Sequence, residues 1–117
     1  EVIAFLTNPQ VRVVSLAGLP ANPNARGLVL WNADDRAGLF LATGLAQVPA
    51  EKIYELWALA DNEPVPAGLF TLDRQGRALL KLAVLPADKT FDKFAVTVEP
   101  AGGVPKPTGP MHLLGSL

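Results

Sequence analysis

The chain contains few side chains whose chemistry could support catalysis. His112 is the single histidine, and Ser15 and Ser116 are the only serines. A serine hydrolase of the nucleophile-elbow type holds its serine in a Gly-x-Ser-x-Gly turn, within reach of a histidine and an acid. Neither serine lies in such a sequence, so we expect no nucleophilic site.

The residue types do not favour a metal site either. Cysteine is absent, and a zinc site normally needs three or four ligands. Met111 lies next to His112, but neighbouring residues of a strand point to opposite faces, and no cysteine could complete a copper site. We therefore predict that the protein holds no metal and no cofactor.

Acidic residues occur in two turn-forming segments. Residues 34–35 follow an asparagine, and Asp61 and Glu63 lie beside Asn62 and Pro64. A glycosidase needs two carboxylates facing each other across a cleft, and an EF-hand needs a twelve-residue pattern of calcium ligands. Neither pattern is evident, so we interpret these acids as turn residues and predict that the protein is not an enzyme.

Phosphate and nucleic-acid recognition are not expected. Gly102 and Gly103 are followed by Pro105, so no helix can begin there to cradle a phosphate. The ten Lys and Arg residues are scattered, and the formal net charge is −1. Without a basic stripe the chain cannot neutralise a nucleic-acid backbone, so we expect no nucleic-acid partner.

Three aromatic residues, Trp31, Tyr54 and Trp57, are the candidate structural or binding residues. Each lies in an expected strand, and large aromatic side chains dominate the cores of β-sandwiches. The alternative is a platform for a sugar or a peptide, which would require at least one exposed ring.

Short apolar segments separated by glycine, proline and acidic turns run through the whole chain. No amphipathic segment of about 10 to 15 residues separates them, which argues against a parallel sheet. We therefore predict an all-β fold, an antiparallel β-sandwich of about eight short strands with a short helical or irregular N-terminal arm. The expected strands are residues 11–16, 27–31, 39–43, 52–59, 67–72, 77–82, 94–99 and 111–114, with a hairpin turn at residues 73–76.

Two of these strands allow finer predictions. Residues 27–31 form a continuous apolar run, which indicates a strand buried on both faces. Within residues 52–59, strand alternation places Glu55 and Trp57 on one face and Tyr54 on the other.

The N-terminal segment, residues 1–7, is apolar at Val2, Ile3, Phe5 and Leu6. We expect it to be one short helical turn or a loose arm that ends at Asn8 and Pro9, because the residue before proline avoids helical geometry. No apolar run of about 20 residues is present to span a membrane. The chain begins at Glu1 rather than Met. We interpret it as a segment of a longer protein, in which any signal peptide or anchor lies upstream.

Several sequence pieces occur along the chain in a recognisable order. They are residues 13–18 (VVSLAG), 27–31 (GLVLW), 43–45 (TGL) with Pro49, 54–59 (YELWAL), 66–70 (PAGLF), 98–103 (VEPAGG), and 107–110 (PTGP) with Gly115. In this order they resemble the C-terminal domain of bacterial anti-sigma factors of the anti-sigma-K type. The resemblance covers nearly the whole chain, and its most specific pieces are the Tyr-x-Leu-Trp strand and the proline- and glycine-rich ending.

The resemblance implies a sensory or regulatory domain on the extracytoplasmic face of the bacterial membrane. In such proteins a cytoplasmic N-terminal domain holds a sigma factor inactive, one transmembrane helix follows, and regulated proteolysis frees the sigma factor. Residues 1–9 would then be a juxtamembrane arm, and residues 10–117 a single β-sandwich domain. The sigma-binding segment is absent from this chain, so the sigma factor would be a partner of the parent protein only.

The partner outside the membrane would be a protein, a small ligand or, as a homodimer, a second copy. An alternative function, from a different class, is a carbohydrate- or protein-binding β-sandwich module of an exported protein.

Overall fold

The computed structural model describes residues 2–117 of the chain. Within these residues one short helix, α1 (Val2–Thr7), precedes eight strands, and it is too short to cross a bilayer. The fold is therefore nearly all-β, as predicted. The strands are β1 (Arg12–Gly18), β2 (Arg26–Asn32), β3 (Ala37–Thr43), β4 (Lys52–Ala60), β5 (Glu63–Phe70), β6 (Ala78–Lys81), β7 (Lys93–Pro100) and β8 (Met111–Ser116).

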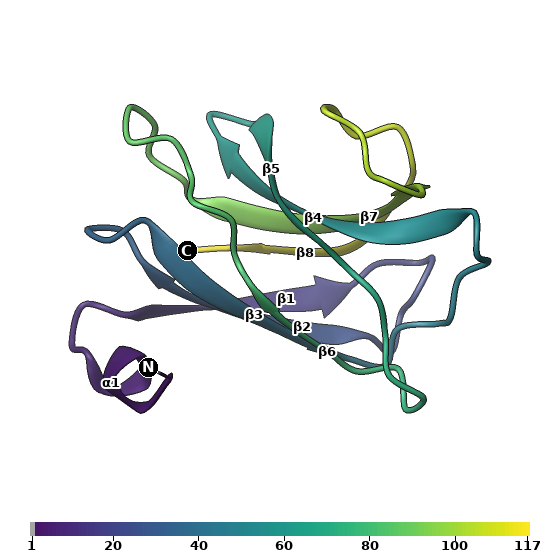
Figure 1. Ribbon diagram of the computed structural model, residues 1–117, viewed down its shortest axis with the longest axis horizontal. Helices are drawn as coiled ribbons and strands as arrows, with labels where there is room; N and C mark the ends of the chain where they lie inside the picture. Colours follow the sequence, from purple (N-terminus) through teal and green to yellow (C-terminus); the bar gives the residue numbers. More distant parts are fainter. Residues whose placement is uncertain (1) are drawn as a thin grey trace.

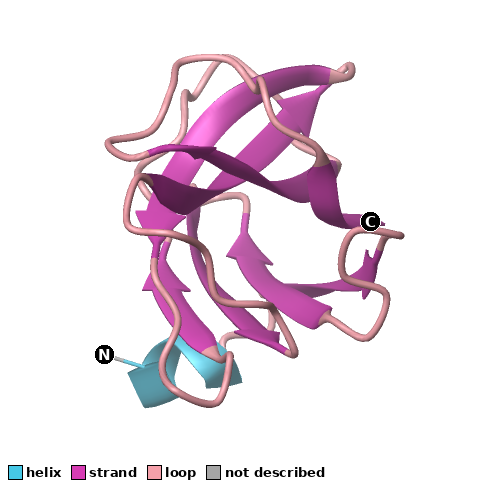
Figure 2. Ribbon diagram, turned by 90° about the vertical axis from the view of Figure 1, so that its right-hand side faces the viewer, coloured by secondary structure: helices cyan, strands magenta, loops and turns pink. Residues whose placement is uncertain are grey.

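All eight strands belong to one antiparallel sheet, in the order β5-β4-β7-β8-β1-β2-β3-β6. The sheet curls over so that β5, β4, β7 and β8 lie above β1, β2, β3 and β6 (Figure 1). The edge strands β5 and β6 approach each other at a seam, near which the Ala83 N–H donates to the Ala67 carbonyl at 2.9 Å. The two layers of the expected sandwich are thus halves of one sheet, which forms a nearly closed barrel (Figure 2).

The connection between β4 and β5 is a two-residue turn. Asp61 and Asn62 both have positive φ, 51° and 65°, as a type I′ hairpin turn requires. The next strand begins at once with Glu63 and contains Pro64 and Pro66. Proline lacks the N–H needed for pairing on both sides, and this strand is at the edge of the sheet, where proline is tolerated.

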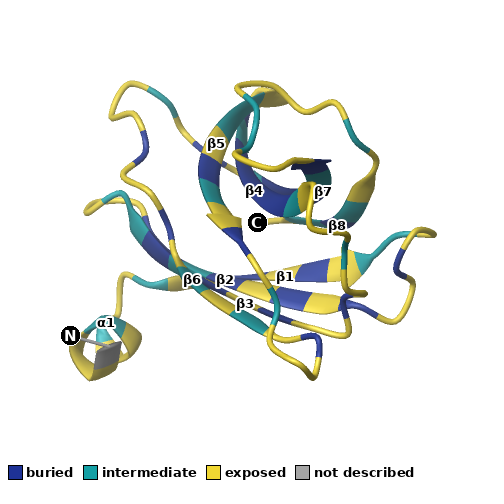
Figure 3. Ribbon diagram, turned by 45° about the vertical axis from the view of Figure 1, so that its right-hand side comes forward, coloured by how far each residue is buried: buried dark blue, intermediate teal, exposed yellow. Residues whose placement is uncertain are grey.

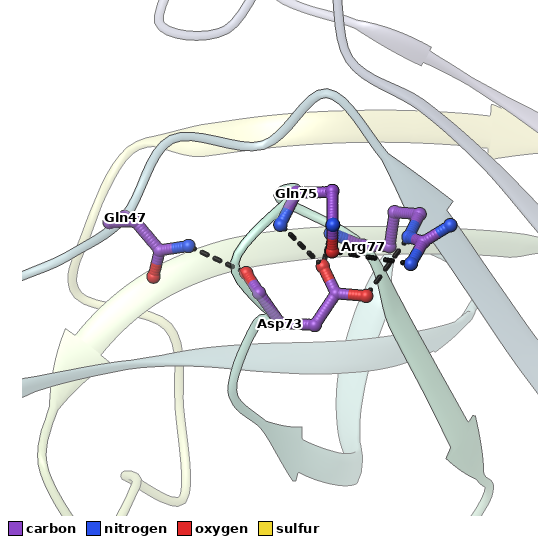
Figure 4. Close-up of polar contacts among 4 residues, drawn as sticks. All are labelled: Gln47, Asp73, Gln75 and Arg77. Carbon is purple, nitrogen blue, oxygen red and sulfur yellow. Dashed lines mark hydrogen bonds and ion pairs between the residues drawn. The ribbon is translucent and has the colours of Figure 1, made fainter.

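The predicted turn at residues 73–76 is present, but it does not make a hairpin. The Asp73 carboxylate accepts hydrogen bonds from the N–H groups of Gln75 and Arg77 and from Arg77 Nε, all at 2.9 Å (Figure 4). These bonds, led by the one from the Arg77 backbone, hold the pKa of Asp73 below its ordinary value. The strands on either side lie at opposite ends of the sheet order, so the turn carries the chain across the seam.

The core fills the space between the two layers. Its aromatic centre includes Tyr54, whose ring stacks on Phe70 with centroids 5.4 Å apart, and Phe40, whose ring lies 5.1 Å from Phe70. Inward residues of strands from both layers complete it, as alternation predicts. The largest aliphatic members with almost no exposed area are Val14, Leu16, Val29, Leu56, Leu85, Val96 and Leu113.

The prediction that residues 27–31 are buried on both faces was wrong. In β2, Val29 faces the core, whereas Leu28 is exposed on the outer face. Leu28 lies opposite Leu41 of β3, which lies opposite Leu79 of β6, and all three are exposed. The lower layer therefore carries a row of apolar side chains on its outer face. This row explains why both the inward and the outward positions of residues 27–31 are apolar.

Candidate functional site

The strands β4 and β7 are buried on both faces, whereas β1 and β2 mostly alternate between buried and exposed residues (Figure 3). The additional cover comes from residues 101–110, the connection between β7 and β8, which we call the strap. Its contacts with the outer face of β4 and β7 are made through two buried glutamates, Glu55 and Glu99.

Glu99 is completely buried and fixes the C-terminal half of the strap. The Thr108 N–H donates to both carboxylate oxygens at 3.1 and 3.0 Å, and the Thr108 hydroxyl donates at 2.5 Å. The Gly109 N–H and the Thr97 hydroxyl add bonds of 3.2 and 2.6 Å. Burial alone would raise the pKa of Glu99, but these hydrogen bonds together hold it below the ordinary value. The side chain is therefore an anion caged by donors.

Glu55 fixes the other half of the strap. Its Oε1 accepts a 3.0 Å hydrogen bond from the Val104 N–H. Burial raises the pKa of Glu55, the bond from Val104 opposes that rise, and the negative charge of Glu99 adds to it. Two buried carboxylates on neighbouring strands thus have pKa values displaced in opposite directions.

Trp57 lies beneath the strap and outside the main core. Its ring is 1% exposed, and its Nε1–H donates to Thr97 Oγ1 at 2.8 Å. Trp57 is buried, as predicted. It does not lie in the main core, where it was also expected, because strand alternation turns its side chain to the outer face of β4 together with that of Glu55. Beside the ring is a groove of about 430 Å³, lined mainly by Leu59, Pro64, Pro107, Pro110 and Met111.

The other two candidate aromatics are also buried. The Tyr54 hydroxyl donates to the Ala46 carbonyl at 2.7 Å. Trp31 packs edge-on against Phe91 and Phe94, with centroid distances of 6.3 and 5.9 Å. Neither ring is more than 3% exposed, so the structure does not bring Trp31, Tyr54 and Trp57 together into an exposed platform.

His112 belongs to a polar cluster that sequence reasoning missed. Its Nδ1 lies 2.5 Å from the Asn22 side-chain nitrogen, and its ring lies edge-on to Tyr54 at 5.7 Å. The Asn22 oxygen accepts from the Ala46 N–H at 3.3 Å. As the Asn22 amide is oriented, it donates to a neutral imidazole, and burial lowers the pKa of His112. Asn22 and His112 are 90 residues apart, so no local pattern could reveal the pair.

Protonation of His112 is expected to destabilise the fold. Its folded-state pKa lies below the unfolded value of about 6.5. The free energy of unfolding should therefore be unaffected by this group above about pH 6.5 and should fall as the pH drops below it. Urea unfolding at pH 7.5 and 5.5 should show a larger loss for the wild type than for His112→Gln. Equal losses would contradict the cluster, and NMR titration of the single histidine gives the pKa directly.

The described residues do not assemble a recognisable catalytic constellation. Ser15 is exposed on β1, whereas the ring contacts of His112 are with Asn22 and Tyr54. Within residues 2–117, no three His, Asp or Glu side chains are grouped in a way that could hold a metal ion. What the geometry shows instead is a nearly closed barrel whose strap is fixed by two buried carboxylates.

Comparison with known proteins identifies the family. The sequence model described as "Anti-sigma-K factor rskA, C-terminal" matches residues 1–111. The chain belongs to the family of anti-sigma-K factor C-terminal domains.

Curated relatives that are named as anti-sigma-K factors agree with this assignment. The chain is similar to "Anti-sigma-K factor RskA" of Mycobacterium sp. (strain KMS), at 30% identity over 87% of the chain and 40% of the relative. It is also similar to "Uncharacterized protein in phr 5'region" of Streptomyces griseus, at 33% identity over 72% of the chain and 34% of the relative. The chain thus spans well under half the length of these relatives. No solved structure matches it.

The ending that suggested the anti-sigma-K family has a clear role in this structure, since it builds the strap. Glu99 is near the end of β7, just before the strap, and Thr108 and Gly109 of the strap donate hydrogen bonds to its carboxylate. Gly109 also lies against the Val98 carbonyl, where any Cβ would clash. Gly103 has a φ of 77°, which favours glycine. These motif residues therefore determine how the strap lies on β4 and β7.

Proposed function

We propose that this anti-sigma-K domain is the extracytoplasmic sensory part of a membrane-anchored anti-sigma factor, and that it controls release of the sigma factor. The observation that carries the proposal is the family match over residues 1–111. Residues 1–9 are proposed as the juxtamembrane arm and residues 10–117 as the sensory domain. The sigma factor would bind a part of the parent protein outside this chain.

Two features of the structure support a relay through the arm. Leu6 of α1 is about half exposed, and the bonds that fix the end of α1 are local ones, such as that from the Asn8 N–H to the Phe5 carbonyl at 3.2 Å. The folded domain alone therefore leaves the arm accessible, so the cover must come from something that the domain binds. Chain ends of this kind open at low free-energy cost and are preferred sites of proteolysis.

The partner is proposed to be an extracytoplasmic protein, a small ligand or a second copy of the chain. The apolar row of Leu28, Leu41 and Leu79 supports a protein partner, because exposed apolar patches of a few hundred Å² often mark interaction surfaces. The carbohydrate-platform alternative is less well supported, since Trp31, Tyr54 and Trp57 are all buried.

Destabilising the domain is expected to accelerate cleavage within residues 1–8 of the full-length parent protein. Trp57→Ala removes a buried ring and destabilises the domain, so a larger fraction of molecules should lose the surface that holds the covering partner. The measurements are the rate of cleavage in cells and transcription from promoters of the cognate sigma factor, and both should rise. The matched control is Arg74→Gln, at an exposed position in the turn before β6. If the wild type and Trp57→Ala give the same cleavage and transcription, the domain does not guard the arm.

A further inference from the structure

A cationic pocket lies at the end of the barrel where the β2–β3 turn, the start of β1 and the connection before β7 come together. This is the end that also carries the C-terminus (Figure 1). The pocket has a volume of about 440 Å³, within the usual range for small-molecule sites. Its lining residues are Arg12, Trp31, Ala33, Arg36, Ala87, Lys89, Thr90, Phe91 and Leu117.

The pocket combines positive charge with aromatic walls. Arg12, Arg36 and Lys89 supply the charge, and no acidic side chain is among the lining residues. The apolar lining includes Ala33, Ala87 and the exposed Leu117, beside the almost fully buried rings of Trp31 and Phe91, which are in edge-on contact at 6.3 Å. This is the composition of a small-molecule site, with apolar walls and a few convergent polar groups.

Among residues 2–117, the cationic side chains of this pocket have few ion-pair partners. Lys89 makes only a long ion pair, 3.7 Å to Glu63. Among the ion pairs of residues 2–117, none involves Arg12 or Arg36. The adjacent Asp35 carboxylate accepts instead from the Asn32 side chain at 3.1 Å. An incoming anion would therefore not have to displace a strong internal partner.

Arg36 is the residue that points most directly to a ligand. Its Nε atom is buried and has no hydrogen-bond partner, although unpaired buried donors are rare in folded proteins. Its φ is 50°, in the left-handed region where glycine or asparagine would be less strained. A half-buried arginine at this last position of the four-residue β2–β3 loop thus costs stability, both through its backbone and through its unpaired donor.

We propose that this pocket binds a small organic anion, with a carboxylate or phosphate group held by Arg36 and Arg12 and an apolar part against Ala87, Leu117 and the small accessible area of Trp31 and Phe91. The planar guanidinium fork of arginine matches both anions with two parallel hydrogen bonds. Because Arg36 Nε is buried, the guanidinium must turn toward the bound anion, and Nε then gains the acceptor that it lacks. The proposal concerns the isolated domain and does not depend on the regulatory function proposed above.

Phenyl phosphate and benzoate are suitable probes, titrated at constant ionic strength into the ¹⁵N-labelled protein and followed by NMR. Saturable shifts are expected at the Trp31 indole N–H and at the amides of Arg36, Thr90 and Phe91. Inorganic phosphate should give weaker shifts at the same residues, since it lacks the ring. Benzyl alcohol, which has the ring without the charge, should give none.

Two variants of Arg36 separate binding from folding. Arg36→Gln removes the guanidinium and should weaken phenyl phosphate binding about tenfold or more. Arg36→Gly should also lose binding, while its melting temperature should be no lower than that of the wild type because the left-handed strain is relieved. The control Arg74→Gln makes the same change in net charge at an exposed turn and should bind as the wild type does.

Three results would overturn the proposal. One is equal affinity of the wild type and Arg36→Gln for phenyl phosphate. Another is a set of shifts that maps away from the lining residues. The third is an equal loss of affinity in Arg74→Gln, which would show that only net charge matters.

Discussion

Trp57→Ala is expected to lower the free energy of unfolding by about 3–5 kcal/mol, as large-to-small changes at buried aromatic sites do. The ring is 1% exposed and separates the outer face of β4 from the strap. Removal of the ring leaves a cavity next to Thr97. The Thr97 hydroxyl also loses the hydrogen bond that Trp57 Nε1 donates to it. Urea denaturation followed by far-UV circular dichroism measures the change without relying on tryptophan fluorescence.

The control for this experiment is Trp57→Phe. Phenylalanine keeps most of the buried apolar surface but cannot donate to Thr97, so the expected cost is smaller, and the lost hydrogen bond accounts for about 1 kcal/mol of it. A change below about 1 kcal/mol for Trp57→Ala would mean that the strap does not cover the ring in solution.

Glu99→Gln is expected to destabilise the protein by about 2–4 kcal/mol, because hydrogen bonds to a charged acceptor are stronger than neutral ones and a buried network loses more than one bond. The donors from Thr108, Gly109 and Thr97 converge on the two carboxylate oxygens. Glutamine has one oxygen, and its NH₂ group would face donors instead of acceptors. The matched control is Glu51→Gln, at an exposed position, which should change stability little.

The pH dependence of the free energy of unfolding also tests the hydrogen bonds around Glu99, and its direction follows from the direction of the pKa shift. The folded-state pKa of Glu99 lies below its ordinary value of 4.5. Its contribution to stability is therefore present above about pH 4.5 and is lost as the pH falls through the folded pKa. The difference between the wild type and Glu99→Gln should thus shrink in acid. A difference that is constant between pH 7 and pH 3 would contradict an ionised, caged Glu99.

Glu55 affects the pH dependence of stability in the direction opposite to Glu99. Because its folded-state pKa is raised, its ionised form is unfavourable to the fold at neutral pH, and protonation relieves this as the pH falls. Both the wild type and Glu99→Gln contain Glu55. The comparison between them therefore isolates the Glu99 cage, apart from the charge that Glu99 exerts on Glu55.

Local patterns in the sequence were sufficient to locate all eight strands, because alternation and turn residues act within a few positions. Asp61 and Asn62 show both the value and the limit of such patterns. They marked a turn correctly, but Pro64 and Pro66 concealed the first residues of β5, which begins at Glu63 and not at the expected residue 67, since proline is compatible with a strand only at an edge. Whether a strand is at an edge depends on the order of the sheet, which local patterns do not encode.

The features of greatest functional interest depend on contacts that are distant in sequence or on backbone conformation. Asn22 meets His112 across 90 positions, and Trp57 is buried by a strap some fifty residues further along the chain. Arg36 seemed to be one scattered arginine among several, because its left-handed conformation and its buried Nε exist only in the folded chain. Glu99 lies on the outer face of β7, and the strap turns that outward position into a buried one.

The prolines of β5 also bear on how the protein behaves when many copies are crowded together. A free strand edge offers rows of N–H and carbonyl groups to which another chain can add, and this is a common route to cross-β aggregation. Pro64 and Pro66 remove two donors from one edge of this sheet, and the other edge, β6, is only four residues long. Molecules packed side by side therefore find little template for strand addition, and the domain can be concentrated on a surface without seeding fibrils.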